Sequence, residues 1–204
     1  MSLKRIWPTA LAVVAAVGLV PATGRATSMS APPTLADMVR DASEIVVGTV
    51  KEVREVRQGA LPVMEVEVAV SERIRGGTGA TIAFRQLSPT ASKGAPQNGV
   101  RFLGNVPGMP RYEKGERVLL FLGPASSAGF RTPIGLQQGK FSLAGGNALN
   151  AMNNRGLFRG VTAPRANDGE SSVLAATHGP VNAPAFVGLV RRAVTEGFWN
   201  GGAR

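Results

Sequence analysis

Glu65 and Glu67 are the two acidic residues of this sequence whose spacing comes closest to a catalytic arrangement. Residues two apart in a β-strand point to the same face of the sheet, so the two carboxylates would lie side by side. Paired carboxylates can hydrolyse a glycosidic bond, one acting as acid and the other as base or nucleophile. On the polar face of a sheet, however, Lys or Arg from a neighbouring strand pairs with such residues. We therefore interpret Glu65 and Glu67 as part of a surface charge ladder.

The other reactive groups are few, because the chain contains one histidine, His178, and no cysteine. A Ser-His-Asp triad needs a rigidly held imidazole, whereas His178 lies next to Gly179 and Pro180 in a stretch expected to be flexible. Metal ligands would have to be carboxylates. The acidic residues at 37, 41 and 44 are explained more simply by helix solvation and by the charge preference of a helix N-terminus. The sequence thus predicts no catalytic residue, no metal and no cofactor.

The N-terminus has the order of a secretory signal peptide. Residues 4 and 5 are basic, residues 6–20 are almost wholly apolar, and small residues follow up to Ala26. A membrane-spanning helix needs ~20 apolar residues, so this shorter run favours a cleaved signal, with cleavage after Ala26 or Gly24. No Arg-Arg pair precedes the run, which favours Sec-type export. We expect an exported protein, periplasmic or secreted, without a transmembrane segment after cleavage.

The chain is basic, and its charge is distributed unevenly. Removing residues 1–26 leaves 178 residues and lowers the formal net charge from +10 to +7. Residues 125–204 hold eight Lys and Arg against three Asp and Glu, so the excess lies mainly in the C-terminal third. Such a surface can bind an acidic protein, anionic lipid or polysaccharide. Nucleic acid is not an expected partner, because there is no dense Lys/Arg tract and no series of aromatic residues to stack bases.

Hydrophobic patterning predicts a mainly β protein. Strand-like segments occur at residues 45–56, 64–70, 80–85 and 118–122. Residues 130–143, interrupted by Pro133 and Gly139, carry one or two more, and a hairpin turn at 145–147 returns through residues 148–152. The first segment changes phase near Lys51 and Glu52, which indicates a β-bulge. Residues 64–70 alternate strictly, as in a half-buried strand. Residues 118–122 are all apolar, which predicts a central strand covered on both faces.

Two helices flank these strands. Thr34 fits the cap of a short helix ending near Ala42, and apolar residues from Phe186 to Val194 at i, i+3, i+4, i+7 and i+8 predict an amphipathic helix. The fold class expected is a small antiparallel OB-like barrel of five to six strands, with a β-sandwich as the alternative. The expected organisation is a signal peptide (1–26), a flexible lead-in (27–33), the barrel domain (34–159), a flexible linker (160–182), the C-terminal helix (183–197) and a tail (198–204).

Several motifs together resemble a family of exported, largely uncharacterised bacterial proteins. The quoted stretches are TLADMVRDASEIVVGTV, SERIRGG, VPGMPRYEKGERVLLFLG and GLQQGKF. They are similar to the family pattern A-D-x-I-V-x-G-x-V, V-L-K-G, G-x-P-x-F-x-x-G-E-x-V-L-L-F-L and G-L-x-Q-G-K-F. The chain departs from it at Ser43, where the pattern has Asp, at Arg75 in place of Lys, and at Tyr112 in place of Phe. The resemblance implies export and no known reaction. The arrangement also looks distantly like the OB-type inhibitory domain of tissue inhibitors of metalloproteinases, whose zinc-chelating cysteine this chain lacks.

A long interval between the third and fourth strands carries the candidate binding residues. Apolar and arginine side chains occur together there, as they do in interface anchors, at Arg101, Phe102, Pro107, Met109, Pro110 and Arg111. The alternative is that they cover an open end of the barrel. The function predicted is a non-enzymatic binding module for an unidentified protein or envelope partner. Two alternatives remain. One is a hydrolase with a Ser and carboxylate site, and the other is a binder of anionic lipid or polysaccharide through the basic C-terminal third.

Overall fold

The computed structural model describes residues 32–59, 61–88 and 108–197. The chain divides into two units, Met1–Ser30 and Ala31–Arg204, and all of the described residues belong to the second. The predicted signal peptide and tail therefore lie outside the described residues.

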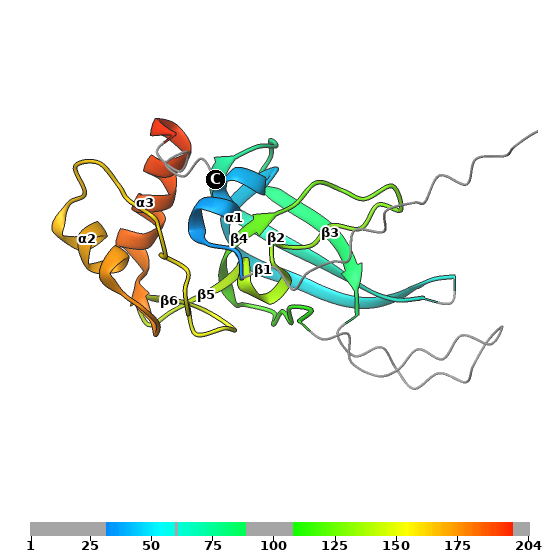
Figure 1. Ribbon diagram of the computed structural model, residues 1–204. Helices are drawn as coiled ribbons and strands as arrows, with labels where there is room; N and C mark the ends of the chain where they lie inside the picture. The colour runs from blue at the N-terminus through cyan, green and yellow to red at the C-terminus, as the bar shows by residue number, and fades with distance from the viewer. Residues whose placement is uncertain (1–31, 60, 89–107, 198–204) are drawn as a thin grey trace, which may run out of the picture. The chain divides into compact units, whose positions relative to one another are not determined.

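The described elements are mostly β-strands, as the sequence predicts. In chain order they are α1 (Leu35–Asp41), β1 (Glu44–Gln58), β2 (Leu61–Arg75), β3 (Thr81–Leu87), β4 (Arg117–Leu122), the 3-10 helix η1 (Leu136–Gln138), β5 (Lys140–Ala144), β6 (Asn147–Asn150), α2 (Asp168–Ala175), β7 (Val181–Asn182) and α3 (Ala183–Glu196) (Figure 1). None of the helices in these described stretches is both long and apolar enough to cross a bilayer.

All seven strands belong to one antiparallel sheet, and that sheet is open. Its order is β3-β2-β1-β4-β5-β6-β7. Within the described stretches, one parallel bridge, between Arg85 and Phe130, joins the β3 edge to the loop after β4. After that loop the chain returns beside β4 as β5 and continues outward to β6 and β7. The expectation of a closed five- or six-stranded barrel is therefore wrong, and the alternative of two separate sheets is not observed.

The β1–β2 ladder shows how local sequence bends the sheet. The register shifts between Val50 and Glu52, so the bulge predicted near Lys51 is confirmed. Gly48 lies close to the neighbouring strand, and a Cβ at this position would overlap the carbonyl oxygen of Ala69. A bulge adds local twist, and this glycine allows the two backbones to approach.

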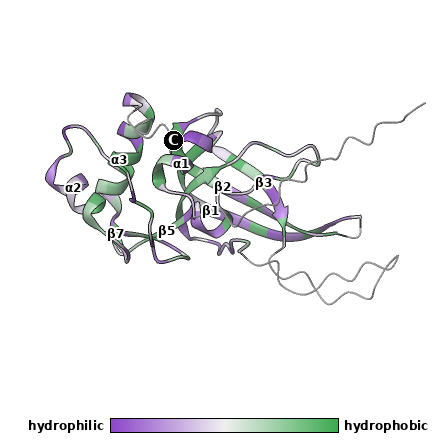
Figure 2. Ribbon diagram, in the orientation of Figure 1, coloured by the Kyte–Doolittle hydropathy of each residue, from purple (hydrophilic) through white to green (hydrophobic). Residues whose placement is uncertain are grey.

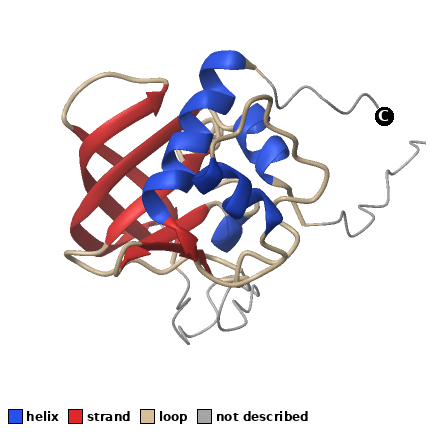
Figure 3. Cartoon of the chain, turned by 90° about the vertical axis from the view of Figure 1, so that its left-hand side faces the viewer, coloured by secondary structure: helices blue, strands red, loops and turns tan. Residues whose placement is uncertain are grey.

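The central strand β4 buries both of its faces, which confirms the prediction from its five apolar residues. Val118, Leu120 and Leu122 belong to a core on one face of the sheet. Leu119 and Phe121 belong to a larger core that includes residues of α1 and α3. The helices lie together on one side of the strands in Figure 3. The sheet thus separates two hydrophobic cores, one of them covered by helices.

Both predicted helices are present. Thr34 caps α1, and its hydroxyl and the Asp37 side chain form a reciprocal capping box. The helix α3 begins after Asn182 and ends at Gly197, and it buries Phe186 against Phe141 with ring centroids 5.0 Å apart. Figure 2 shows both hydrophobic and hydrophilic residues along α3, as an amphipathic helix requires.

The segment 160–182 is not the linker that its composition suggested. It contains α2 and β7, and the side chains of Val173 and Val181 are buried in the helix-covered core. Asn167 and Glu170 form a capping box that starts α2. Too few apolar residues occur here to show a helical period, so composition alone missed a helix that tertiary packing stabilises. The prediction of a flexible linker is wrong.

Candidate functional site

A cleft of about 370 Å³ lies where the segment before β4 meets the β5–β6 hairpin. We call it the Met109 cleft. Its lining residues are Met109, Pro110, Arg111, Gln137, Lys140, Ser142, Leu149, Asn150 and Ala151. Three of the six sequence-predicted binding residues are therefore brought together here, whereas Arg101, Phe102 and Pro107 lie outside the described residues.

The floor of the Met109 cleft is fixed by backbone hydrogen bonds. Met109 is only 8% exposed, and Pro110 is buried as well. The side-chain amide of the buried Gln86 donates to the Pro110 carbonyl at 2.8 Å. The Gly108 carbonyl accepts from the Gln137 N–H at 2.9 Å. Residues 108–110 therefore pack on the body of the protein, while Arg111 is exposed.

The rim of the cleft carries exposed apolar side chains. Leu149 and Met152, 36% and 39% exposed, are the large hydrophobic residues that remain accessible in the described part of the chain. Leu149 lines the cleft directly. The Gln137 amide lies 3.1 Å from the Met152 sulfur, which places Met152 beside the wall. Solvent-exposed hydrophobic side chains next to a concavity are a common feature of binding sites.

Two asparagines hold the wall that bears Leu149. The backbone N–H of Asn150 donates to the side-chain oxygen of Asn154 at 3.0 Å. In return, the backbone N–H of Asn154 donates to the side-chain oxygen of Asn150 at 2.9 Å. Asn154 also donates to the carbonyls of Ala148 and Gly179. Its φ of 52° is left-handed, a conformation that asparagine tolerates better than most residues. The wall is thus positioned before any partner arrives.

Lys140 lines the cleft, but its charge is already compensated. Its ammonium lies 2.6 Å from the Glu116 carboxylate and 5.1 Å from the centre of the Tyr112 ring. Burial, and secondarily the Glu116 charge, raises the pKa of Tyr112 above its ordinary value of 10.0. Arg111, by contrast, is exposed and forms no ion pair with another described residue. Arg111 is therefore the cation that the cleft can offer to a ligand.

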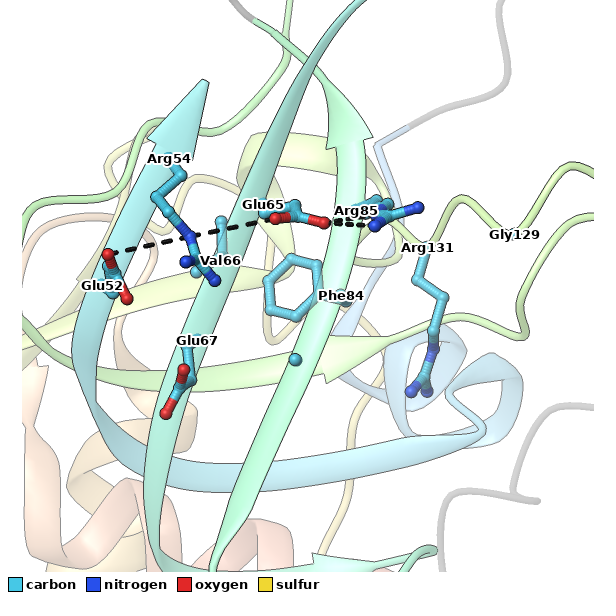
Figure 4. A pocket seen from close by; sticks show the side chains of 10 residues that line it. Glu52, Arg54, Glu65, Val66, Glu67, Phe84, Arg85, Gly129 and Arg131 are labelled. Atoms are coloured by element: carbon cyan, nitrogen blue, oxygen red, sulfur yellow. Dashed lines mark hydrogen bonds and ion pairs between the residues drawn. The ribbon is translucent and has the colours of Figure 1, made fainter. Parts of the chain in front are cut away.

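A second cleft, of about 360 Å³, lies over strands β1, β2 and β3 (Figure 4). Figure 4 shows Glu65 between Arg54 and Arg85. The Glu65 carboxylate lies 2.5 Å from the Arg85 guanidinium and 3.9 Å from that of Arg54. Glu67 pairs with Lys51 at 2.9 Å. The predicted surface ladder of Glu65 and Glu67 is confirmed, and both carboxylates are engaged by cations rather than facing each other across a reaction site.

The acidic residues considered as metal ligands have structural partners. Asp37 caps α1, Asp41 pairs with Arg40 at 2.8 Å, and the 8%-exposed Glu44 accepts from Arg73 and Arg131. Among the described stretches, no group of three His, Asp or Glu side chains is placed to hold a metal ion. His178 is exposed, and its ring Nδ1 lies 3.0 Å from the Thr177 hydroxyl.

Arg75, one of the departures from the family pattern, and Arg131 hold neighbouring elements together. Arg75 donates to the carbonyls of Val39 and Ala42 at the end of α1. Burial lowers the pKa of Arg131, whose guanidinium joins Glu44 to the Gly123 carbonyl. These residues tie α1, β1, β2 and the loop after β4 together.

The described residues thus form a mainly β protein with one open antiparallel sheet, and the Met109 cleft and the cleft over β1, β2 and β3 lie on its surface. Comparison of the chain with family models, curated proteins and solved structures returned no match.

Sequence reasoning missed the other lining residues of the Met109 cleft, which are Gln137, Lys140, Ser142, Leu149, Asn150 and Ala151, and the neighbouring Met152. A signal for one of them was present. Leu149 follows the Gly145-Gly146 turn in a strand whose side chains alternate between the two faces of the sheet. Ala148 and Asn150 are buried on one face, so the Leu149 side chain had to point to the opposite face, away from the helix-covered core. Whether that face is covered depends on distant parts of the chain.

Proposed function

We propose that this protein is an exported, non-enzymatic binding module that contacts another protein through the Met109 cleft, in the cell envelope or outside the cell. One observation carries the proposal: Leu149 and Met152 remain exposed beside a cleft whose floor is held by the Gln86–Pro110 hydrogen bond. A rigid concavity with accessible apolar side chains provides the anchoring contacts that dominate protein interfaces.

The chemistry of the cleft supports binding rather than turnover. Its charged lining residues are Arg111 and Lys140, and Lys140 is paired with Glu116. The remaining lining residues offer thioether, proline ring, hydroxyl, amide and aliphatic groups. A reaction needs a nucleophile beside a base, or an acid placed against a leaving group. Ser142 offers a hydroxyl and Lys140 an amine, but the Lys140 ammonium is held by the Glu116 carboxylate, so no lining residue is placed as a free base beside a nucleophile.

Export is proposed from the N-terminal sequence and from the resemblance to exported bacterial proteins. The distant similarity to an inhibitory domain fits a module that acts by binding a protein, although a cysteine-based mechanism is impossible in this chain. Secretion is tested by expressing the full chain and sequencing the N-terminus of the exported product. A product retained in the cytoplasm with residues 1–26 intact would contradict export.

The alternative of a lipid or polysaccharide surface in the basic C-terminal third is less well supported. Arg191 pairs with Glu72 at 2.7 Å, and Arg192 pairs with Glu170 and with Glu196. These arginines stabilise contacts between elements of the protein, so part of the basic excess is already neutralised.

Site-specific photo-crosslinking in the producing cell tests the binding function. A photoreactive residue replacing Met152 should give a discrete protein adduct, and Leu149→Asp in the same chain should abolish it. The matched control carries the photoreactive residue at Thr195, an exposed position of α3, and should give no such adduct. Absence of an adduct at Met152, or the same adduct from both positions, would overturn the proposal.

The enzymatic alternative is tested separately with ester, peptide and glycan substrates. Turnover by the purified protein that one Ser or Glu substitution abolishes would show a hydrolase and contradict the non-enzymatic proposal.

A further inference from the structure

We propose that the Met109 cleft recognises an acidic peptide segment, in which one large apolar side chain enters the cleft and a neighbouring Asp or Glu pairs with Arg111. This inference rests on the proposed function, because it names the chemistry of the partner at the same site.

The dimensions of the cleft suit a side chain. Its volume of about 370 Å³ is near the lower end of ligand pockets, which run from ~300 to 1,000 Å³. Met109 and Pro110 are recessed, while Leu149 stands on the rim. An apolar side chain entering the cleft would cover these groups and remove the exposed surface of Leu149 from water.

The partner cannot bind here simply by adding a strand. β6 pairs with β7 only through Asn147 and Ala148. Beyond that point, Asn154 accepts from the Asn150 N–H at 3.0 Å and donates to the Ala148 carbonyl at 2.9 Å. These backbone groups are those that an added strand would use. Recognition must therefore depend on side chains.

Charge selects an acidic partner. The lining residues include no Asp or Glu, and the ammonium of Lys140 is held by Glu116. Arg111 is exposed without an ion-pair partner among the described residues. Arg155, also exposed, belongs to the same turn as Met152, since its N–H donates to the Met152 carbonyl at 3.2 Å. An exposed arginine of the cleft lining, next to exposed apolar side chains, complements a carboxylate-bearing segment.

A membrane surface with anionic headgroups shares part of this chemistry, but the shape of the cleft argues against it. Interfacial binding inserts apolar residues that project from the protein. Met109 and Pro110 instead form a recessed floor. A peptide side chain can reach that floor, whereas a bilayer surface cannot follow a concavity of this size.

A peptide array provides the test. The probes are immobilised heptapeptides with a central Leu, Met or Phe flanked by Asp and Glu, by Asn and Gln, or by Lys and Arg, all incubated with the purified full chain. We expect binding to the acidic set, weakened roughly tenfold or more by Arg111→Glu. The same variant should gain binding to the Lys and Arg set, because the charge preference is reversed.

Leu149→Asp should abolish binding to the acidic set, while Thr195→Asp should leave it unchanged. Leu149→Gln serves as a second variant if Leu149→Asp lowers the melting temperature. Equal binding to all three sets, or an acidic preference that Arg111→Glu leaves intact, would overturn the inference. Cosedimentation with phosphatidylglycerol-containing vesicles that depends on Leu149 would also overturn it in favour of a membrane.

Failure of the inference and failure of the proposed function give different results. A Met152 crosslink to a protein, combined with no acidic preference on the array, refutes the acidic segment and leaves a protein-binding module. Loss of the Met152 crosslink refutes the binding function itself.

Discussion

Gln86 donates a hydrogen bond from its side-chain amide to the carbonyl of Pro110 over 2.8 Å, and Gln86 is completely buried. The bond joins the edge strand β3 to the segment that leads into β4. It therefore fixes the floor of the Met109 cleft from inside the protein, directly before the exposed Arg111.

Replacing Gln86 by Ala should destabilise the protein and weaken binding together. The change leaves the Pro110 carbonyl without its buried donor, at a cost of ~1–3 kcal/mol. Urea unfolding measures the loss, and the array measures binding at a temperature where the variant stays folded. Gln58→Ala, at an exposed position of β1, is the matched control and should change the stability by less than ~0.5 kcal/mol. A Gln86→Ala protein as stable as the wild type would show that this bond is not an anchor.

The buried carboxylate of Glu44 should be far more important for stability than the half-buried carboxylates of β2. Glu44→Gln leaves the guanidinium groups of Arg73 and Arg131 without their shared anion, and breaking a buried ion pair in this way costs ~3–5 kcal/mol. Glu67→Gln removes the more exposed pair with Lys51 and should cost at most ~1 kcal/mol. Chemical denaturation of both variants gives the comparison. Equal losses would contradict a structural role specific to Glu44.

The elements that sequence analysis recovers are those whose signals are local. The bulge at Lys51 follows from a change in the phase of valines, and the capping of α1 follows from Thr34 and Asp37 three residues apart. The burial of β4 on both faces follows from its uninterrupted apolar run. Each of these features depends on side chains within a few positions of one another.

The features that sequence analysis misses depend on residues far apart in the chain. Barrel closure would require a ladder between β3 and the loop after β4, and the structure has one bridge there, at Arg85 and Phe130. The helix α2 is stabilised by packing of Val173 into a core built by distant elements. Leu149 belongs to the candidate site because its neighbour Ala148 is buried in the helix-covered core on one face of the sheet, whereas Leu149 points to the opposite face and is exposed.

The stability of α1 should fall in acid because of Asp37. Burial alone would raise the pKa of Asp37, but hydrogen bonds from Thr34 and the interaction with Arg40 outweigh it and hold the pKa below its ordinary value of 3.8. The folded-state pKa is thus the lower one, so the stabilisation is present above about pH 4 and is lost as the pH falls through the folded value.

Asp37→Asn should therefore reduce stability at neutral pH by ~0.5–2 kcal/mol, as for other capping residues, and should flatten the acid limb of the stability profile. Unfolding free energies measured across the acid range give both effects. Asp41→Asn, a more exposed change at the other end of α1, is the control. An acid limb that is unchanged in Asp37→Asn would refute the assignment.

Tyr112 should resist ionisation until the protein unfolds. It is the one tyrosine of the chain, so the phenolate absorbance reports this residue alone. Burial, with a smaller contribution from Glu116, raises the pKa of Tyr112 above 10.0. Because the folded-state pKa is the higher one, the associated stability is present below pH ~10 and is lost as the pH rises above that value.

Alkaline titration should show a late, cooperative appearance of phenolate that coincides with the loss of near-ultraviolet circular dichroism. In denaturant the same residue should titrate near pH ~10. Phenolate that forms near this value while the fold remains intact would show that the ring is accessible and would contradict the burial of Tyr112 beside Lys140.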